Sequence, residues 1–162
     1  MQLLCYDGFS MKNKNFAQEN CAIARCLEVV GHWWTLLIIR EAFSGVSKFG
    51  DFQSRLGIAR NILTVRLKKL VEDGILQMEN TGGQRREYFL TDKGRELIYV
   101  LVALSQWGNK WLFPSGRPIP RLVDKQDLLE LAPLEIRSRN GRILSNNDIE
   151  FLSPDNKHYE KE

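Results

Sequence analysis

The sequence predicts a mainly α-helical fold with one small β-hairpin, followed by a small β appendage near the C-terminus. Three observations lead to this prediction. Apolar residues recur at helical spacing through most of residues 21–112. Short turns containing Gly31, Gly45 and Gly57 divide that stretch into separate helices. Two strand-like runs then flank the glycine-rich connection at residues 81–84, which is typical of a hairpin.

Composition places the chain among ordinary globular proteins. It has 162 residues, of which 43% are hydrophobic and 27% are charged, so a core can form. The formal net charge is only +3, but its distribution is uneven. Residues 21–112 carry 13 cations against 9 acids, and residues 57–71 carry four cations and no acid. A basic block of this kind beside a helix end attracts phosphates.

The three cysteines, Cys5, Cys21 and Cys26, indicate a reduced setting. Their odd number and irregular spacing do not fit a disulfide framework. Cys21 and Cys26 also lack neighbouring ligands at metal-binding spacing, so neither a metal nor a cofactor is expected. No apolar run approaches the ~20 residues of a membrane span, and no secretory signal is recognisable. We therefore expect a cytoplasmic protein.

Two helices are predicted after a polar, flexible arm at residues 1–20. The first helix starts at Cys21, with Asn20 as its N-cap, and stops at Gly31. The second covers residues 33–43, where apolar residues are dense. The apolar positions that share one face of the first helix are Ile23, Leu27 and Val30.

A third helix, a tight turn and a fourth helix follow. The third helix covers residues 48–56, and Gly57-Ile58 forms the turn. The fourth helix covers residues 59–73, and Gly74 is well placed as its C-terminal cap. The expected core positions are Phe49, Phe52 and Leu56 in the third helix and Leu63, Leu67, Leu70 and Val71 in the fourth.

A hairpin and a last helix complete the predicted domain. Strands over residues 75–80 and 85–90 form the hairpin. Thr91 caps a fifth helix over residues 92–112. Its apolar positions are Leu97, Val100, Leu101, Leu104, Trp107 and Trp111.

Residues 113–162 form an extension of different character. Three prolines between residues 114 and 120 prevent the helix from continuing. Asn140-Gly141 predicts a hairpin between short strands at residues 134–138 and 142–145. A disordered tail is expected from about Pro154.

The order of these elements is that of a winged helix-turn-helix domain, which suggests DNA binding. At about 100° per residue, Leu63 and Leu67 lie on the core side of the fourth helix. Asn61, Thr64, Val65, Lys68 and Glu72 lie on the opposite, mostly polar side. A helix with such a free face fits the major groove of DNA.

The side chains on that face suit base and phosphate contacts. Asn61 can pair with adenine, Thr64 and Val65 can touch a thymine methyl, and Lys68 can reach guanine or a phosphate. Arg60 in the first turn can contact a base or the backbone, and the hairpin can bring cations to a minor groove. The full set of expected DNA contacts is Lys48, Arg60, Asn61, Thr64, Val65, Arg66, Lys68, Lys69, Gln84, Arg85 and Arg86.

Other interpretations of these residues remain open. Arg66 and Lys69 fit solvated surface charges equally well. Arg85 and Arg86 can pair with acids across the hairpin. A winged-helix module that binds protein rather than DNA would share the fold but carry a more neutral face. Catalysis is disfavoured, because no Ser-His-Asp arrangement, phosphate loop or nucleotide fingerprint is present.

The run from Cys21 to Gly31, followed by Trp34 to Arg40, resembles the opening of HxlR-type (DUF24) bacterial regulators. The resemblance covers about residues 20–112. It implies a winged-helix repressor or activator that binds palindromic operators as a homodimer, with the first and last helices as the dimer interface. Further matching residues are Lys48-Phe49, Gly57-Ile58, Leu63, Arg66-Leu67, Leu70, Gly74-Ile75-Leu76 and Tyr88 to Gly94.

The sequence departs from the family pattern at several positions. Ala59 replaces a frequent serine, so the fourth helix loses its usual N-cap side chain. Val65 replaces a polar residue on the free side of the fourth helix, and Cys26 replaces a small residue such as alanine. The extension beyond residue 112 is longer than in the shortest members.

Two further features invite hypotheses about an effector. Cys21 matches a cysteine with which some family members sense oxidants or electrophiles. A helix N-terminus would stabilise its thiolate, and Arg25 four residues on could assist. The alternative is that Cys21 and Cys26 are small buried hydrophobes. Trp107 and Trp111 could stack a planar ligand, but we favour a role in the core or the dimer interface.

Overall fold

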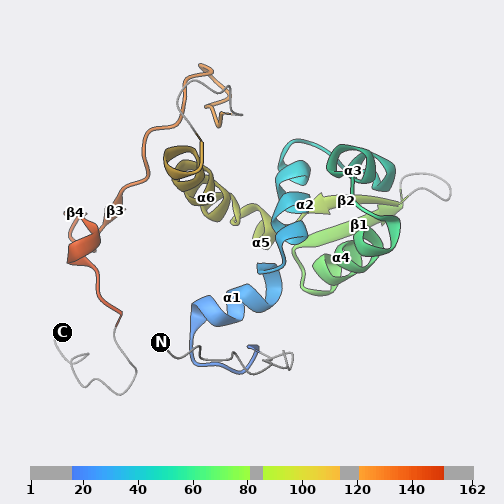
Figure 1. The fold of residues 1–162 in the computed structure, drawn as a ribbon, viewed down its shortest axis with the longest axis horizontal. Helices are drawn as coiled ribbons and strands as arrows, with labels where there is room; N and C mark the ends of the chain where they lie inside the picture. Colours follow the sequence, from blue (N-terminus) through green and yellow to red (C-terminus); the bar gives the residue numbers. More distant parts are fainter. Residues whose placement is uncertain (1–15, 81–85, 114–120, 152–162) are drawn as a thin grey trace, which may run out of the picture. The chain divides into compact units, whose positions relative to one another are not determined.

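The computed structural model describes residues 16–80, 86–113 and 121–151. It divides into two compact units, residues 1–101 and 102–162, which are described separately. The element order confirms the winged helix-turn-helix fold with a small C-terminal β appendage (Figure 1). The helices are α1 (Ala22–Val30), α2 (Trp33–Phe43), α3 (Phe49–Leu56), α4 (Arg60–Glu72), α5 (Asp92–Arg95) and α6 (Ile98–Trp111). The strands are β1 (Leu76–Asn80), β2 (Arg86–Leu90), β3 (Ile136–Arg137) and β4 (Ile143–Leu144).

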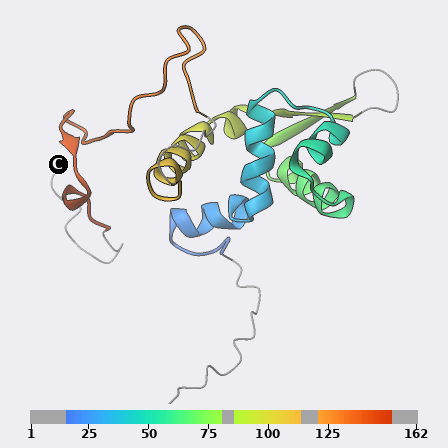
Figure 2. The ribbon, with the colours of Figure 1, turned by 45° about the horizontal axis from the view of Figure 1, so that its top comes forward.

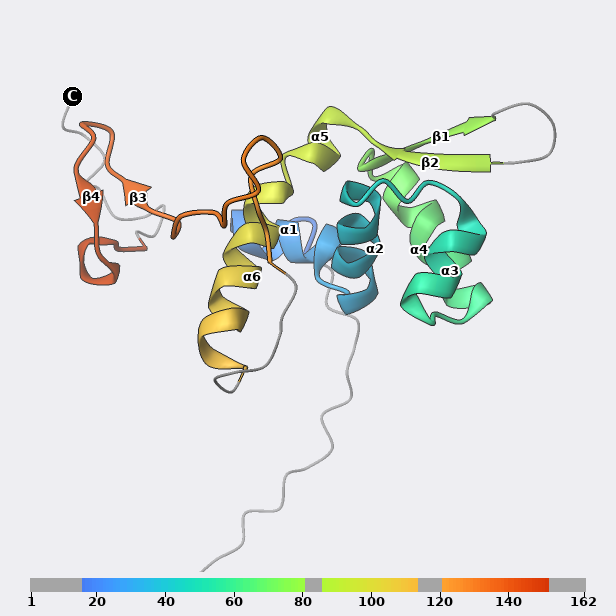
Figure 3. The same ribbon diagram turned by 90° about the horizontal axis from the view of Figure 1, so that it is seen from above.

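The first unit is built on the antiparallel hairpin β1–β2. Leu76 pairs with Leu90 at its base, and Asn80 pairs with Arg86 at the far end. Helices α2 and α3 contact β2, α4 contacts β1, and Figure 3 shows α3 and α4 on one side of the hairpin. The segment before α3 extends the sheet, because the Tyr88 amide donates to the Ser47 carbonyl at 2.9 Å.

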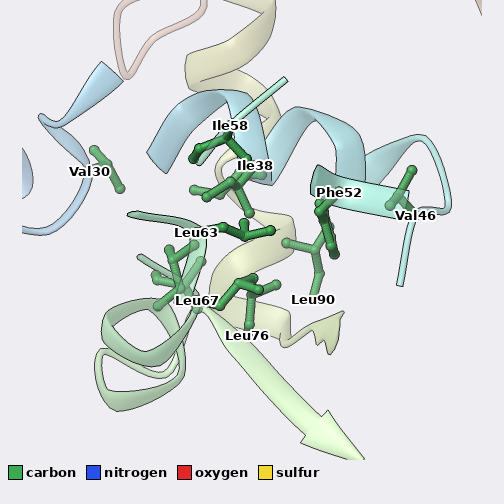
Figure 4. Close-up of a cluster of buried hydrophobic side chains, with 12 residues drawn as sticks. Val30, Ile38, Val46, Phe52, Ile58, Leu63, Leu67, Leu76 and Leu90 are labelled. Carbon is green, nitrogen blue, oxygen red and sulfur yellow. The ribbon is translucent and has the colours of Figure 1, made fainter. Parts of the chain in front are cut away.

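The core of this unit is almost entirely aliphatic. Its members come from every element between α1 and β2, so the hairpin and the helices share one packed interior (Figure 4). The apolar spacing predicted Phe52 of α3 and Leu63, Leu67 and Leu70 of α4, whereas the predicted Phe49, Leu56 and Val71 are only partly buried against this core. The buried residues are Val30, Ile38, Ile39, Val46, Phe52, Ile58, Leu63, Leu67, Leu70, Ile75, Leu76 and Leu90.

One carboxylate is buried beside this core. Glu41 of α2 accepts hydrogen bonds from Arg40 Nε and Nη2 at 3.1 and 2.7 Å and from Arg55 Nε at 2.6 Å. Burial alone would raise the pKa of Glu41, but the hydrogen bonds from the two guanidinium groups outweigh it and hold the pKa below its ordinary value. Because Arg55 belongs to α3, this ionic cluster links α2 to the helix-turn-helix.

The start of α1 differs from the prediction in one respect. The N-cap is Cys21 and not Asn20. Cys21 has an extended backbone and lies just before the helix, whereas the prediction placed it in the first turn. Of the three apolar residues predicted on one face, only Val30 is buried, while Ile23 and Leu27 are exposed. Helix α1 meets α2 at a bend of 75° (Figure 2). This face of α1 is therefore uncovered in the single chain.

The predicted helix over residues 92–112 is in fact two helices. Thr91 caps α5 as expected, since its Oγ1 accepts from the Gly94 amide at 3.1 Å. The helix is then interrupted, because Leu97 and Tyr99 bond to carbonyls only three residues earlier. Gly94 packs so tightly that a Cβ there would lie 2.2 Å from the Ile75 carbonyl oxygen. This close packing fixes α5 on the hairpin and separates it from α6.

The second unit contains the predicted small hairpin. Strands β3 and β4 pair antiparallel, and Ile136 lies opposite Leu144. Gly141, whose φ of 86° favours glycine, completes the turn after Asn140. The strands are shorter than expected, with two residues each. The expected tail from Pro154 lies outside the described residues.

No single helix among the described residues is long and apolar enough to cross a membrane, although the bent pair α1 and α2 together has that length and composition. Within the same residues no group of three or more His, Cys, Asp or Glu side chains is placed to hold a metal ion.

Candidate nucleic-acid interface

The helix-turn-helix is formed by α3, a three-residue turn and α4. Gly57 adopts the left-handed conformation, with φ 62° and ψ 24°, which ends α3 sharply. Ile58 is buried and fastens the turn to the core. Ala59 is the N-cap of α4 and provides no side-chain hydrogen bond, as its residue type predicts. The first amides of α4 therefore have no side-chain cap.

Helix α4 has one buried side and one open side. Leu63, Leu67 and Leu70 are at most 1% exposed, which fixes the rotation of the helix about its axis. Residues on the opposite side are exposed, and Val65 reaches 59%. Val65 is thus an apolar side chain that is largely open to solvent. The exposed residues of this reading face are Asn61, Thr64, Val65 and Lys68.

Short contacts fix several side chains around the reading face. The guanidinium of Arg60 lies 5.9 Å from the centre of the Phe49 ring, a cation–π contact between the two helices. Thr64 Oγ1 donates to the Arg60 carbonyl at 2.8 Å, which leaves its methyl group for apolar contact. Lys68 forms only a loose pair with Glu72, at 3.7 Å, between well-exposed side chains. Such a pair costs little to break when a phosphate approaches.

Arg66 and Lys69 lie beside the reading face. They line an open hollow of about 440 Å³ together with Val65 and Lys68 of that face, with His32 and with the end of α1. Lys69 pairs with Asp73 at 2.8 Å, and this hydrogen bond raises the pKa of Lys69. Arg66 is half-buried, and its Nε has no hydrogen-bond partner. The hollow therefore adjoins the reading face, and both cations border it.

Two of the expected cations near the hairpin are exposed. Lys48 is the N-cap of α3, and its backbone forms an isolated antiparallel bridge with Glu87 of β2. Arg86 is the first residue of β2. Gln84 and Arg85 lie outside the described residues. Glu87 lies opposite Glu79 in the hairpin register and accepts a hydrogen bond from Ser47 Oγ at 2.9 Å.

His32 has a structural role that the sequence did not reveal. It is the N-cap of α2, and its Nδ1 accepts from the Trp34 amide at 3.3 Å. Burial and the charge of Arg66 lower the pKa of His32, which keeps the imidazole neutral and able to accept. Its position directly before an apolar helix was the available signal.

The thiols and the late tryptophans are exposed in the single chain. Cys21 and Cys26 are free and exposed, so neither is a buried hydrophobe here. Arg25, which was expected to assist Cys21, donates from Nε to the Glu19 carbonyl at 2.6 Å. Trp107 and Trp111 are 57% and 65% exposed, which excludes a core role within this chain.

Comparison with known proteins gives the family. Residues 29–115, more than half of the chain, match the HxlR-like helix-turn-helix family. The chain belongs to this family. Its members are transcriptional regulators, not enzymes, in agreement with the prediction from the sequence. The match covers α2 through α6, and therefore the whole interface described above.

Individual relatives agree with this assignment. An uncharacterized HTH-type transcriptional regulator of Mycobacterium tuberculosis, Rv3095, is 46% identical over 104 residues, which is 62% of this chain and 66% of that protein. The chain thus spans slightly less than two thirds of that relative. The crystal structure of PA1607, a candidate transcription factor, is 41% identical and has a TM-score of 0.81, covering 86% of this chain and 98% of its own. The redox regulator HypR in its reduced form is 28% identical, with a TM-score of 0.50 and coverage of 56% and 92%.

Proposed function

We propose that this protein is a cytoplasmic transcriptional regulator that binds double-stranded operator DNA through the reading face of α4. The observation that carries the proposal is the exposure of Asn61, Thr64, Val65 and Lys68 on a helix whose other side is locked into the core. A helix held by Leu63, Leu67 and Leu70 keeps its rotation, so these side chains reach base edges in a fixed register. Family membership supports the same function.

The roles of the residues follow from their positions. Asn61 and Lys68 lie where they can donate to purine edges, and Val65 with the Thr64 methyl can contact thymine methyl groups. Arg60 and the uncapped amides at the start of α4 suit a backbone phosphate. Lys48 and Arg86, and with them Gln84 and Arg85, would contact the flanking backbone or minor groove. Arg66 and Lys69 support α4 and add positive charge.

We further propose a homodimer that binds a palindromic site, with residues 21–112 as the DNA-binding and dimerisation domain. Exposed apolar side chains on α1 and on α6 supply surfaces that a second copy could cover; Ile23, Leu27, Trp107 and Trp111 are each more than half exposed. A two-fold axis would set the two α4 helices about 34 Å apart, one turn of B-DNA. Sedimentation at micromolar concentration tests this assembly, and a monomer would contradict it.

Selection of bound duplexes from a random library, followed by gel-shift titration of the winning sequence, tests DNA binding. The account predicts enrichment of an inverted repeat and an affinity that falls steeply with salt, because several phosphates are neutralised. Recovery of no sequence, or an affinity insensitive to salt, would favour the protein-binding alternative.

A second proposal concerns control by the thiol of Cys21. It is exposed at the N-cap of α1, and a solved structure 28% identical to this chain is that of the redox regulator HypR. Oxidation or alkylation there would alter the α1 surface of the dimer and so the affinity for DNA. Treatment with peroxide or an alkylating agent should change the affinity of the wild type but not of Cys21→Ser, with Cys26→Ser as the matched control. An unchanged wild type would end this proposal.

A further inference from the structure

We propose that residues 121–151, termed here the C-terminal arm, pack against a second copy of the chain and clasp the dimer. The inference rests on the proposed homodimer and names a segment outside the proposed α1 and α6 contacts.

The arm has a definite conformation. Its first part is a turn in which the Asp124 amide donates to the Leu129 carbonyl and the Leu128 amide donates to the Asp124 carbonyl, both at 2.9 Å. Its second part is the β3–β4 hairpin. Gln106 of α6 fixes the segment between them, since its side-chain amide bonds the Ala132 carbonyl and the Leu134 amide at 2.8 Å each. The arm is therefore directed from α6 along a set path.

Yet this ordered segment buries almost nothing. No residue between 121 and 151 is buried in the single chain. A hairpin with two residues in each strand is not stable in water without a surface to cover it. The exposed apolar residues of the arm are Leu122, Val123, Leu128, Leu129, Leu131, Leu134, Ile136, Ile143, Ile149 and Phe151.

Leu128 gives the most specific evidence. It is the one described non-glycine residue with positive φ, 61°, a conformation that costs a leucine about 1 kcal/mol. Its side chain is nevertheless 73% exposed, and that of Leu129 is 67% exposed. The turn thus holds Leu128 in a strained conformation, although neither Leu128 nor Leu129 is buried among the described residues. Such strain persists where another surface uses it.

Part of the extension has a counterpart in one solved relative. Residues 1–113 make up about 70% of the chain, so the 86% match to PA1607 includes part of the extension. The match to HypR takes in only 56% of this chain, although it covers 92% of HypR.

Charge and connectivity favour a second copy as the occupant. The arm carries five cations and six acids, a net charge of −1, which does not suit binding to DNA phosphates. Nine residues in the sequence separate it from α6, whose exposed Trp107 and Trp111 belong to the proposed dimer surface. An arm that begins near a two-fold interface can reach the second copy of the chain. Because the interface is symmetric, each arm then buries the same residues on the other copy.

Photo-crosslinking of the full chain tests this inference. Two unlabelled variants, Phe151→p-benzoylphenylalanine and Leu128→p-benzoylphenylalanine, are each mixed with ¹⁵N-labelled wild type and irradiated. The proteins are then digested, and the crosslinked peptides are assigned by mass. Peptides joining an unlabelled arm to a labelled chain support the clasp. Crosslinks confined to one chain, or none, in a protein that sediments as a dimer overturn the clasp and leave the dimer intact. A monomer refutes the homodimer itself.

A variant gives an independent measurement. Leu128→Gly relieves the backbone strain and removes the side chain. If Leu128 has no partner in the second copy, the dimer dissociation constant should not change. The clasp predicts a dimer dissociation constant raised about tenfold or more, the equivalent of one buried leucine side chain. Arg139→Ala, in the exposed hairpin turn, is the matched control and should leave the constant unchanged. An unchanged constant for Leu128→Gly overturns the proposal.

Discussion

Replacing Glu41 by glutamine tests how α2 is joined to the helix-turn-helix. The carboxylate is only 7% exposed and accepts three charge-assisted hydrogen bonds from Arg40 and Arg55. A buried hydrogen bond to a charged group contributes about 1.5–3 kcal/mol. The two arginine side chains are more than half exposed, so solvent screens their interactions with Glu41. The desolvation of Glu41 offsets a further part of the summed free energy of the three hydrogen bonds.

We therefore expect Glu41→Gln to lower the free energy of unfolding by about 2 kcal/mol, roughly 8 °C in Tm for a domain of about 100 residues. Urea unfolding followed by circular dichroism measures it. Glu72→Gln is the control, since Glu72 forms only an exposed pair with Lys68 and should cost less than about 0.5 kcal/mol. Equal effects of the two substitutions would refute the reasoning.

The same pair of proteins has a defined pH dependence. The pKa of Glu41 is lowered in the folded state, so its contribution is complete above the ordinary value of 4.5 and is lost as the pH falls through the lowered pKa. The stability difference between wild type and Glu41→Gln should be constant above about pH 5.5 and shrink below about pH 4.5. A difference that grows on acidification would contradict this sign.

Three further predictions concern the same unit. Gly94→Ala should destabilise the fold by roughly 1–3 kcal/mol, because its Cβ would meet the Ile75 carbonyl, whereas Gly50→Ala meets no atom within 4 Å and should be neutral or mildly stabilising in thermal unfolding. Phe52→Ala should cost roughly 3–5 kcal/mol in urea unfolding, since Phe52 is fully buried, and a loss below 1 kcal/mol would contradict that packing. The lowered pKa of His32 makes its protonation unfavourable in the fold, so the wild type should lose stability as the pH falls from about 7 to 5. His32→Asn should keep the α2 cap and remove this loss of stability.

The sequence was most informative where periodicity and turn residues agreed. The spacing of Leu63, Leu67 and Leu70 located the core side of α4, and Gly57 and Gly74, both at positive φ, located the ends of α3 and α4. These local rules fix which side of α4 is free. The reading face could therefore be predicted from the residues alone.

Features that depend on tertiary contacts were missed. The break between α5 and α6 follows from the close approach of Gly94 to Ile75, which no helical periodicity shows. The burial of Glu41 depends on Arg55, fourteen residues away in the next helix. The basic block contained Arg66 and Lys69, but it did not show the hollow that they line with Val65, Lys68, His32 and the end of α1. Likewise, periodicity marked Ile23 and Leu27 as apolar without showing that the single chain leaves them exposed.

The affinity of α4 variants for a selected duplex tests the central claim most directly. Fluorescence anisotropy would compare the wild type with Asn61→Ala, Lys68→Ala and the control Arg95→Ala, an exposed cation on α5. Asn61→Ala should weaken binding about tenfold and relax the preference for one base pair. Lys68→Ala should weaken binding and, if Lys68 contacts a phosphate, make the affinity less dependent on salt. Arg95→Ala should leave the affinity almost unchanged. Folded Asn61→Ala and Lys68→Ala proteins that bind as tightly and as selectively as the wild type would contradict this claim.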